Sequence, residues 1–269
     1  MARAVTAAAT PAELSRRFPS YDVFGAKITP TTADDLLEII RTHVEAGEQC
    51  IVASQNLHGL RVLQDDSAFR TLHALPETYV HIDGMPIVGL CRLAGVPARR
   101  DHRVTLLDVI WPLLRLAAAL GWRVFWIGGT TAVQRLGLAE VRLRVPGLQV
   151  EGVPGYFDPQ GESGAGVAST LAEYRPHVVL VGMGMGRQEG WILAQRRGIA
   201  PACFFTVGAC LEYIAGTTPT PPRWMGRIGL EWLFRLARDP ARFWHRYLIE
   251  PWPVAVAILR ARHRADRRR

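Results

Sequence analysis

The chain has 269 residues, of which 49% are hydrophobic and 21% are charged, and its formal net charge is +8. This composition excludes a disordered chain, a collagen-like chain and a disulfide-stapled miniprotein, and the length suits one large α/β domain or two small ones. No uninterrupted apolar run reaches the roughly 18–20 residues that span a bilayer, and residues 1–22 lack the apolar core of a signal peptide. We therefore expect a cytoplasmic protein.

Short apolar segments alternate with helical patterns between residues 32 and 207. The expected strands, rich in β-branched and aromatic residues, are 50–54, 79–82, 123–127, 148–153, 177–181 and 203–207. The expected helices are 32–46, 57–74, 106–120, 132–145, 167–174 and 188–197. Strands that are apolar on both faces are typical of a parallel sheet covered by helices. We predict an α/β, Rossmann-like domain over residues 22–216, preceded by an N-terminal segment, 1–21, that we expect to be disordered.

The C-terminal segment 217–269 differs from the rest of the chain. It begins with the extended sequence TTPTPP, and residues 220–269 contain 12 Arg and 4 acidic residues, so the whole net charge lies there. Four of the eight Trp are interleaved with these Arg. The pattern indicates a basic helical appendage that associates with an anionic membrane surface. Two alternatives are a nucleic-acid contact and a solvated helix pair packed on the domain, and we expect no nucleic-acid partner.

Asp83 is the candidate catalytic acid, because it follows an apolar strand and precedes Gly84. Ligands of an open α/β sheet bind at the carboxyl ends of its strands, and a carboxylate there could accept a proton from an attacking hydroxyl. The alternative is an Asp that caps the following helix. Ser54 and Asn56 follow the first strand, at the same edge of the sheet.

Two glycine loops, at Gly128 and Gly129 and at Gly182-x-Gly184-x-Gly186, each lie between a strand and a helix. Such loops allow close approach of a phosphate, although glycines alone are weak evidence. The dinucleotide-binding pattern needs an early loop and an acid on the next strand, and neither is present. DxD and Walker motifs are also absent, and the four Cys have no zinc-ligand spacing, so we expect no metal site and four buried free thiols.

An ordered set of motifs completes the pattern: Ser54-x-Asn56, Asp83-Gly84-Met85-Pro86, Arg103-Val104 with Asp108, Gly128-Gly129, Gly155-Tyr156-Phe157, Gly184 with Gln188-Glu189-x-Trp191, Val207-Gly208-Ala209, Ala215-Gly216, Pro222-x-Trp224-Met225 and Gly229-Leu230-Glu231-Trp232 with Arg235-Leu236. Together they resemble the WecG/TagA/CpsF glycosyltransferase family over about residues 22–250. The ordered set is specific, although no single element of it is.

The resemblance implies an inverting, metal-independent transfer of a sugar from a UDP-sugar to a polyprenyl-diphosphate-linked saccharide, in exopolysaccharide, capsule or cell-wall polymer synthesis. It implies a peripheral position at the inner face of the cell membrane and no cofactor beyond the donor. Asp83 maps to the general base, with Ser54 and Asn56 orienting a substrate. Expected nucleotide contacts are Gly128, Gly129, Tyr156, Gly184, Gln188 and Glu189, and expected acceptor or phosphate contacts are Arg103, Arg223 and Arg227. The last two substitute for a family Arg that is Thr220 in this chain.

A different reading of the same sheet is a soluble Rossmann-type enzyme that uses NAD or another nucleotide. The missing ribose-binding acid argues against it. A non-catalytic basic binding protein is a third reading, against which Asp83 argues. The Trp and Leu of the appendage would also suit a homo-oligomer interface.

Overall fold

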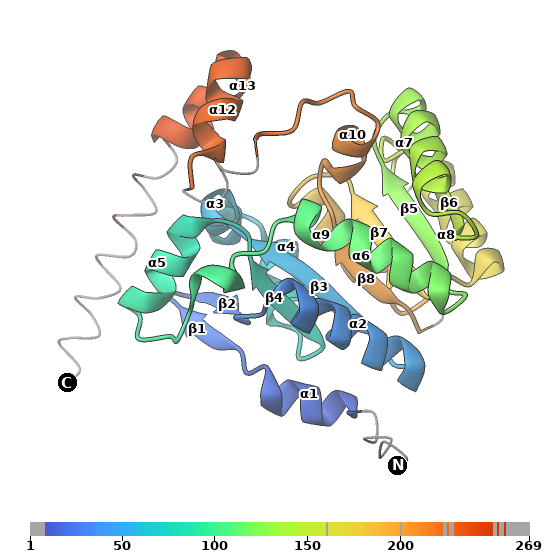
Figure 1. Cartoon of the computed structure of the whole chain (residues 1–269), viewed down its shortest axis with the longest axis horizontal. Coiled ribbons are helices and arrows are strands. Elements are labelled where there is room, and N and C mark those ends of the chain that lie inside the picture. Colours follow the sequence, from blue (N-terminus) through green and yellow to red (C-terminus); the bar gives the residue numbers. More distant parts are fainter. Residues whose placement is uncertain are drawn as a thin grey trace, which may run out of the picture.

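The computed structural model describes residues 9–159, 161–199, 201–222, 225, 229–249, 252 and 256 (Figure 1). Its centre is a parallel sheet with the strand order β4-β3-β8-β7-β5-β6. The strands are β3 (Cys50–Gln55), β4 (Thr78–Ile82), β5 (Arg123–Gly128), β6 (Gln149–Val153), β7 (Val178–Gly182) and β8 (Cys203–Thr206). All six predicted strands are confirmed, each with ends shifted by at most one residue.

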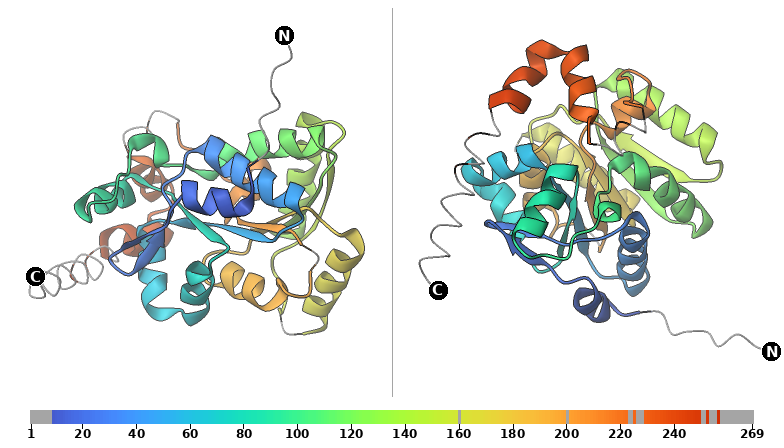
Figure 2. Two further views of the ribbon diagram at one scale, coloured as in Figure 1. Left: turned by 90° about the horizontal axis from the view of Figure 1, so that it is seen from below. Right: turned by 60° about the vertical axis from the view of Figure 1, so that its left-hand side comes forward.

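Helices cover both faces of the sheet, as the two views of Figure 2 show. One face packs against α1 (Pro11–Arg17), α2 (Ala33–Ala46), α6 (Leu106–Ala119), α7 (Thr131–Arg144) and α10 (Cys210–Ile214). The other packs against α3 (Leu57–Asp65), α4 (Ser67–Ala74), α5 (Met85–Leu93), α8 (Glu162–Tyr174) and α9 (Arg187–Gln195). Successive strand residues therefore enter different cores, so both alternating positions are apolar. The four cysteines are buried free thiols, as expected.

The structure corrects several sequence-based expectations. The predicted helix 57–74 is two helices, because Asp66 ends α3 and its side chain accepts a hydrogen bond from the backbone N–H of Phe69 to cap α4. The segment 1–21 is not disordered from residue 9 onward, since Thr10 caps α1 and the buried Leu14 anchors it. A short antiparallel hairpin, β1 (Tyr21–Val23) and β2 (Ala26–Ile28), was not predicted because its strands have three residues each.

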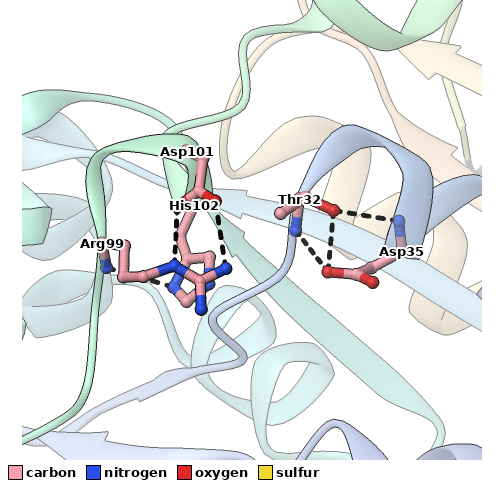
Figure 3. Close-up of polar contacts among 5 residues, drawn as sticks. All are labelled: Thr32, Asp35, Arg99, Asp101 and His102. Carbon is pink, nitrogen blue, oxygen red and sulfur yellow. Dashed lines mark hydrogen bonds and ion pairs between the residues drawn. The ribbon is translucent and has the colours of Figure 1, made fainter.

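Polar contacts fix the loop that leads to Arg103 (Figure 3). Nε and Nη2 of Arg99 donate to the two carboxylate oxygens of Asp101, each at 3.0 Å, and the backbone N–H of Arg99 donates to Nδ1 of His102. Beside this loop, Thr32 and Asp35 form the capping box that begins α2. The backbone of Val104 then bonds to the carbonyl of Ile82, which places Arg103 next to the end of β4.

The described part of the appendage contains α12 (Glu231–Arg238), α13 (Pro240–Trp244) and a π-helical turn, His245–Ile249. Figure 1 shows α12 and α13 beyond the edge at which the strands end. An ion pair of 2.8 Å between Arg103 and Glu231 ties α12 to the loop after β4. Within the described ranges, no helix has both the length and the hydrophobicity needed to cross a membrane.

Candidate active site

Asp83 and Asn56 meet at the carboxyl ends of β4 and β3. The backbone N–H of Asp83 donates to the carbonyl of Gln55, and Nδ2 of Asn56 donates to Oδ2 of Asp83 at 3.2 Å. Gly84, with φ +134°, is the N-cap of α5, and no side chain caps that helix. The alternative that Asp83 serves as a helix cap is therefore wrong, and its carboxylate is available for chemistry.

Asp83 lines two cavities. The larger, of about 330 Å³, is lined by the ends of β3, β7 and β8, and includes Ser54, Gly184 and Gln188. The smaller, of about 220 Å³, is lined by Leu57, Met85, Pro86, Arg103 and Trp232 among others. Asn56, His58, Asp83, Glu231 and Arg235 line both cavities. A group bound in one cavity can therefore meet a group bound in the other at the Asp83 carboxylate.

The appendage completes both cavities. Arg235 of α12 lies with its guanidinium carbon 5.9 Å from the ring centroid of Tyr213, and the charges of Asp83 and Glu231 act on it. Sequence reasoning did not assign Arg235, Glu231 or Tyr213 a role. Arg235 and Glu231 could have been found because they belong to the last motif of the ordered set. Tyr213 could have been found because it follows β8 closely.

Gln188 and Glu189 begin α9, and both are buried. Gln188 lines the larger cavity, whereas Glu189 lies behind it and is 1% exposed. Burial raises the pKa of Glu189 to about 7, although hydrogen bonds from Gln188 and Gly186 act in the opposite direction. Of these two predicted nucleotide contacts, Gln188 therefore lines the cavity, and Glu189 supports Gln188 from behind.

The predicted contacts Gly128, Gly129 and Tyr156 lie farther along the sheet edge, outside the linings of the two cavities. An added Cβ on Gly155 would lie 2.9 Å from Cα of Gly128, so close packing of two loops accounts for small residues here. Tyr156 is 70% exposed, and the guanidinium carbon of Arg187 lies 5.9 Å from its ring centroid. Arg187 in turn is adjacent in sequence to Gln188, which lines the larger cavity.

His81 lies on β4, two residues before Asp83, and is fully buried. Burial lowers its pKa, which keeps the ring neutral, although the charge of Asp83 acts in the opposite direction. The predicted contacts Arg223 and Arg227 lie outside the described residues. Nowhere in the described ranges do three or more His, Cys, Asp or Glu side chains gather as metal ligands would.

Large apolar side chains are exposed along the described part of the appendage. They are Trp232, Leu233, Trp244, Leu248, Ile249, Trp252 and Val256. The exposed Arg238 lies in the last turn of α12, whereas Arg235 of the same turn faces the cavities. The described part of the appendage therefore presents exposed Trp and Leu side chains beside an exposed Arg.

A sheet with a carboxylate and two cavities at its strand ends defines an α/β enzyme that binds its substrates beyond the carboxyl edge. Residues 21–268 match the model of the glycosyl transferase WecG/TagA/CpsF family, and the chain belongs to that family. Its similar proteins include the N-acetylglucosaminyldiphosphoundecaprenol N-acetyl-beta-D-mannosaminyltransferases of Staphylococcus aureus strains MW2, NCTC 8325 / PS 47 and MRSA252. Each is 23% identical over 220 residues, which are 81% of this chain and 84% of the relative.

Proposed function

We propose that the protein transfers a sugar from a UDP-sugar to a polyprenyl-diphosphate-linked saccharide, with inversion at the anomeric carbon. The observation that carries the proposal is the position of Asp83, which both cavities share. Family membership supports glycosyl transfer, and the name of the relatives describes a diphosphoundecaprenol-linked acceptor and an N-acetylmannosaminyl group. We place this chain's activity in the synthesis of a bacterial surface polymer.

The reaction is a single displacement. The acceptor hydroxyl oxygen attacks the anomeric carbon of the donor, the bond from that carbon to the UDP oxygen breaks, and UDP leaves with the electron pair. Asp83 accepts the hydroxyl proton as a general base. One attack from the face opposite the leaving group inverts the configuration. Asn56 holds one carboxylate oxygen of Asp83 by the 3.2 Å hydrogen bond, so the other oxygen is free to face the acceptor.

The two cavities suit two different substrates. The larger is lined by Ser54, Gly184 and Gln188 at the strand ends, where an α/β sheet binds nucleotides, so we assign it to the donor. Because Asp83 also lines this cavity, we place the transferred sugar of the donor there. The exposed ring of Tyr156 beside Arg187 offers a stacking surface for the uracil base. The smaller cavity combines apolar side chains with Arg103, which suits a polyprenyl chain joined to a diphosphate.

We assign the neutralisation of the substrates' phosphate charges to arginine side chains. Arg235 lines both cavities and Arg103 lines the smaller one, and guanidinium groups bind phosphate oxygens with two parallel hydrogen bonds. Arg235 can offset the negative charge that develops on the diphosphate as UDP leaves, and Arg103 can bind the diphosphate of the acceptor. We therefore propose a metal-independent reaction, which a turnover assay in the presence of EDTA would test.

Peripheral membrane association explains the exposed apolar side chains of the appendage. Trp232 lines the smaller cavity and also has an exposed surface, so this cavity lies directly beneath the apolar face of α12. A lipid-linked acceptor could pass from the bilayer surface into the cavity without crossing bulk water. The predicted homo-oligomer stays a prediction.

Calorimetry of UDP binding, with ADP and NAD as controls, tests the proposal on the wild type and on Asp83→Asn. Asn has nearly the shape of Asp and cannot accept the proton at neutral pH. We expect both proteins to bind UDP in preference to ADP and NAD, and the variant to lose turnover by about 10²–10⁴-fold. Preference for NAD, or an Asp83→Asn protein with wild-type turnover, would contradict the proposal.

A further inference from the structure

The side chains of Gln188 and Glu189 form a buried pair at the wall of the larger cavity. Nε2 of Gln188 donates to Oε1 of Glu189 at 2.8 Å, and the backbone N–H of Gly186 donates to Oε2 of Glu189 at 2.6 Å. Gln188 is 2% exposed, and its Oε1 has no hydrogen-bond partner among the described residues. A buried acceptor without a hydrogen-bond partner raises the free energy of the folded state, so we expect a ligand to supply a donor to this oxygen.

We propose that Glu189 is a positioning residue that holds the Gln188 carboxamide with its oxygen toward the larger cavity, where that oxygen accepts a hydrogen bond from an N–H or O–H group of the transferred sugar. Glu189 itself does not touch the sugar. The inference rests on the proposed function, because it needs a UDP-sugar in that cavity. It adds a requirement on the donor, which must present a hydroxyl or an acetamido N–H at this place.

The direction of the carboxamide follows from the ionised state of Glu189. A carboxylate only accepts hydrogen bonds, so it pairs with the NH₂ group of Gln188 and repels the carboxamide oxygen. The oxygen must then face away from Glu189. Protonated Glu189 carries an O–H that can donate to the Gln188 oxygen, and the carboxamide is then free to turn. The cavity wall would present an NH₂ group in place of an acceptor.

The sugar is the part of the donor that meets Gln188. Asp83 lines the same cavity, and the anomeric carbon must lie near Asp83 during the transfer. Tyr156, the candidate surface for the base, lies outside that cavity lining. UDP alone should therefore be insensitive to the orientation of Gln188, whereas a UDP-sugar should depend on it.

The surroundings place the titration of Glu189 in a measurable range. Burial raises its pKa to about 7, and Asp66, at the junction of α3 and α4, raises it further. The carboxylate of Asp66 lies close to Gly186, because an added Cβ on Gly186 would lie 2.9 Å from its Oδ2. The backbone N–H of the same Gly186 donates to Glu189. The other titratable groups of the adjacent α4 are Arg70, which bonds to the carbonyls of Leu63 and Gln64, and His73, which burial keeps neutral.

Equilibrium binding of UDP-N-acetylglucosamine and of UDP tests the proposal on the wild type and on Glu189→Gln. The variant keeps an acceptor for the N–H of Gly186, and its NH₂ group can donate to the Gln188 oxygen and turn it away from the cavity. At pH 8 we expect the UDP-sugar to bind about tenfold more weakly, which corresponds to the loss of one hydrogen bond, while UDP binds as before. Equal weakening of UDP, or wild-type affinity for the UDP-sugar, would overturn the proposal.

The pH profile provides a second, independent readout. Wild-type affinity for the UDP-sugar should fall as the pH falls through about 7, because Glu189 becomes protonated. The diphosphate of a UDP-sugar, unlike the terminal phosphate of UDP, has no group that titrates near neutral pH, so the slope belongs to the protein. Glu189→Gln should abolish the slope.

Asp66→Asn is the matched variant, because Asn caps a helix as well as Asp does. Removal of this charge lowers the pKa of Glu189, so the midpoint of the profile should move to lower pH while affinity at pH 8 is unchanged. An unshifted midpoint would overturn the role of Glu189 even if Glu189→Gln failed to fold. If the wild type binds UDP but its affinity for the UDP-sugar does not fall in acid, this inference alone is overturned. A wild type that binds neither overturns the proposed function as well.

Discussion

Asn56 serves both the fold and the chemistry. Its Oδ1 accepts a hydrogen bond of 3.0 Å from the backbone N–H of Gly59 and so caps α3, while its Nδ2 holds Asp83. The two roles use opposite ends of one carboxamide. A substitution can therefore remove either role or both.

Asn56→Ser separates them. Serine caps a helix about as well as asparagine but cannot reach Asp83, so we expect unchanged thermal stability and a kcat about tenfold lower. Asn56→Ala should lose the same activity and also about 1 kcal/mol of unfolding free energy. Thermal melts and steady-state kinetics of both variants measure the difference. Wild-type kcat in Asn56→Ser would show that the hydrogen bond to Asp83 has no catalytic role.

Ionisation of the buried Glu189, in the first turn of α9, lowers the stability of the folded protein at neutral pH. The pKa of Glu189 rises from 4.5 to about 7 on folding, so the native state binds more protons than the unfolded state between these values. The contribution of Glu189 to stability is therefore greatest in acid and is lost as the pH rises toward 7.

Glu189→Gln should remove this loss. We expect the variant to gain stability relative to the wild type between pH 5 and pH 8, by about 3 kcal/mol at most. Denaturant unfolding at the two pH values measures it. Glu45→Gln, on the surface of α2, is the control and should stay within about 0.5 kcal/mol of the wild type at both. A constant difference between Glu189→Gln and wild type would mean that Glu189 is not protonated in the folded protein near neutrality.

The docking of α12 depends on the ion pair between Arg103 and Glu231. Their side chains are 12% and 28% exposed, so the pair is shielded more than an ordinary surface pair. Its contribution lies between those of exposed and buried pairs, and we take about 1 kcal/mol. Loss of the pair should increase the population in which α12 is detached about fivefold.

Limited proteolysis of Glu231→Gln tests this expectation. Cleavage within residues 217–230 should be faster than in the wild type, while the melting of the α/β domain changes little. Glu140→Gln, which breaks the exposed Glu140–Arg144 pair on α7, is the control and should be cleaved like the wild type. Equal cleavage of all three proteins would show that the ion pair does not hold α12 in place.

The appendage gives the whole molecule one apolar side. Trp232 and Trp244 are exposed there, so we expect the protein to cosediment with anionic vesicles and to be released by salt. The double substitution Trp232→Ala and Trp244→Ala should reduce partitioning at least tenfold, because burial of a large apolar side chain contributes about 1.5–3 kcal/mol. Leu143→Ser, at a 74% exposed site on α7, is the control. Equal binding of the control and the double variant would place the membrane contact elsewhere.

The sequence predicts the sheet better than it predicts the completed site. Buried strands leave a continuous apolar signal, and Asp83 and Asn56 could be found because they follow two of them. Arg235 could not, because its position beside Asp83 depends on how α12 folds back over the strand ends. The break at Asp66 was missed because apolar periodicity continues on both sides of it, although Asp66-Ser67 is an ordinary cap signal. Glu189 illustrates a further limit, since a motif shows that a residue belongs to a site but not whether it faces the ligand.

The strand order also has a consequence for synthesis on the ribosome. β8 lies between β3 and β7, and it brings Cys203 into register with both Cys50 and Val178. Until residues 203–206 have emerged, β3 and β7 each lack their β8 neighbour, and strand edges without a neighbour invite pairing with other chains. The strand that completes the sheet is also the last one made, so the central gap closes only after most of the chain has been translated. Pairings between segments so far apart in the chain form slowly, which makes the stage before β8 is made the period when nascent copies are most exposed to aggregation.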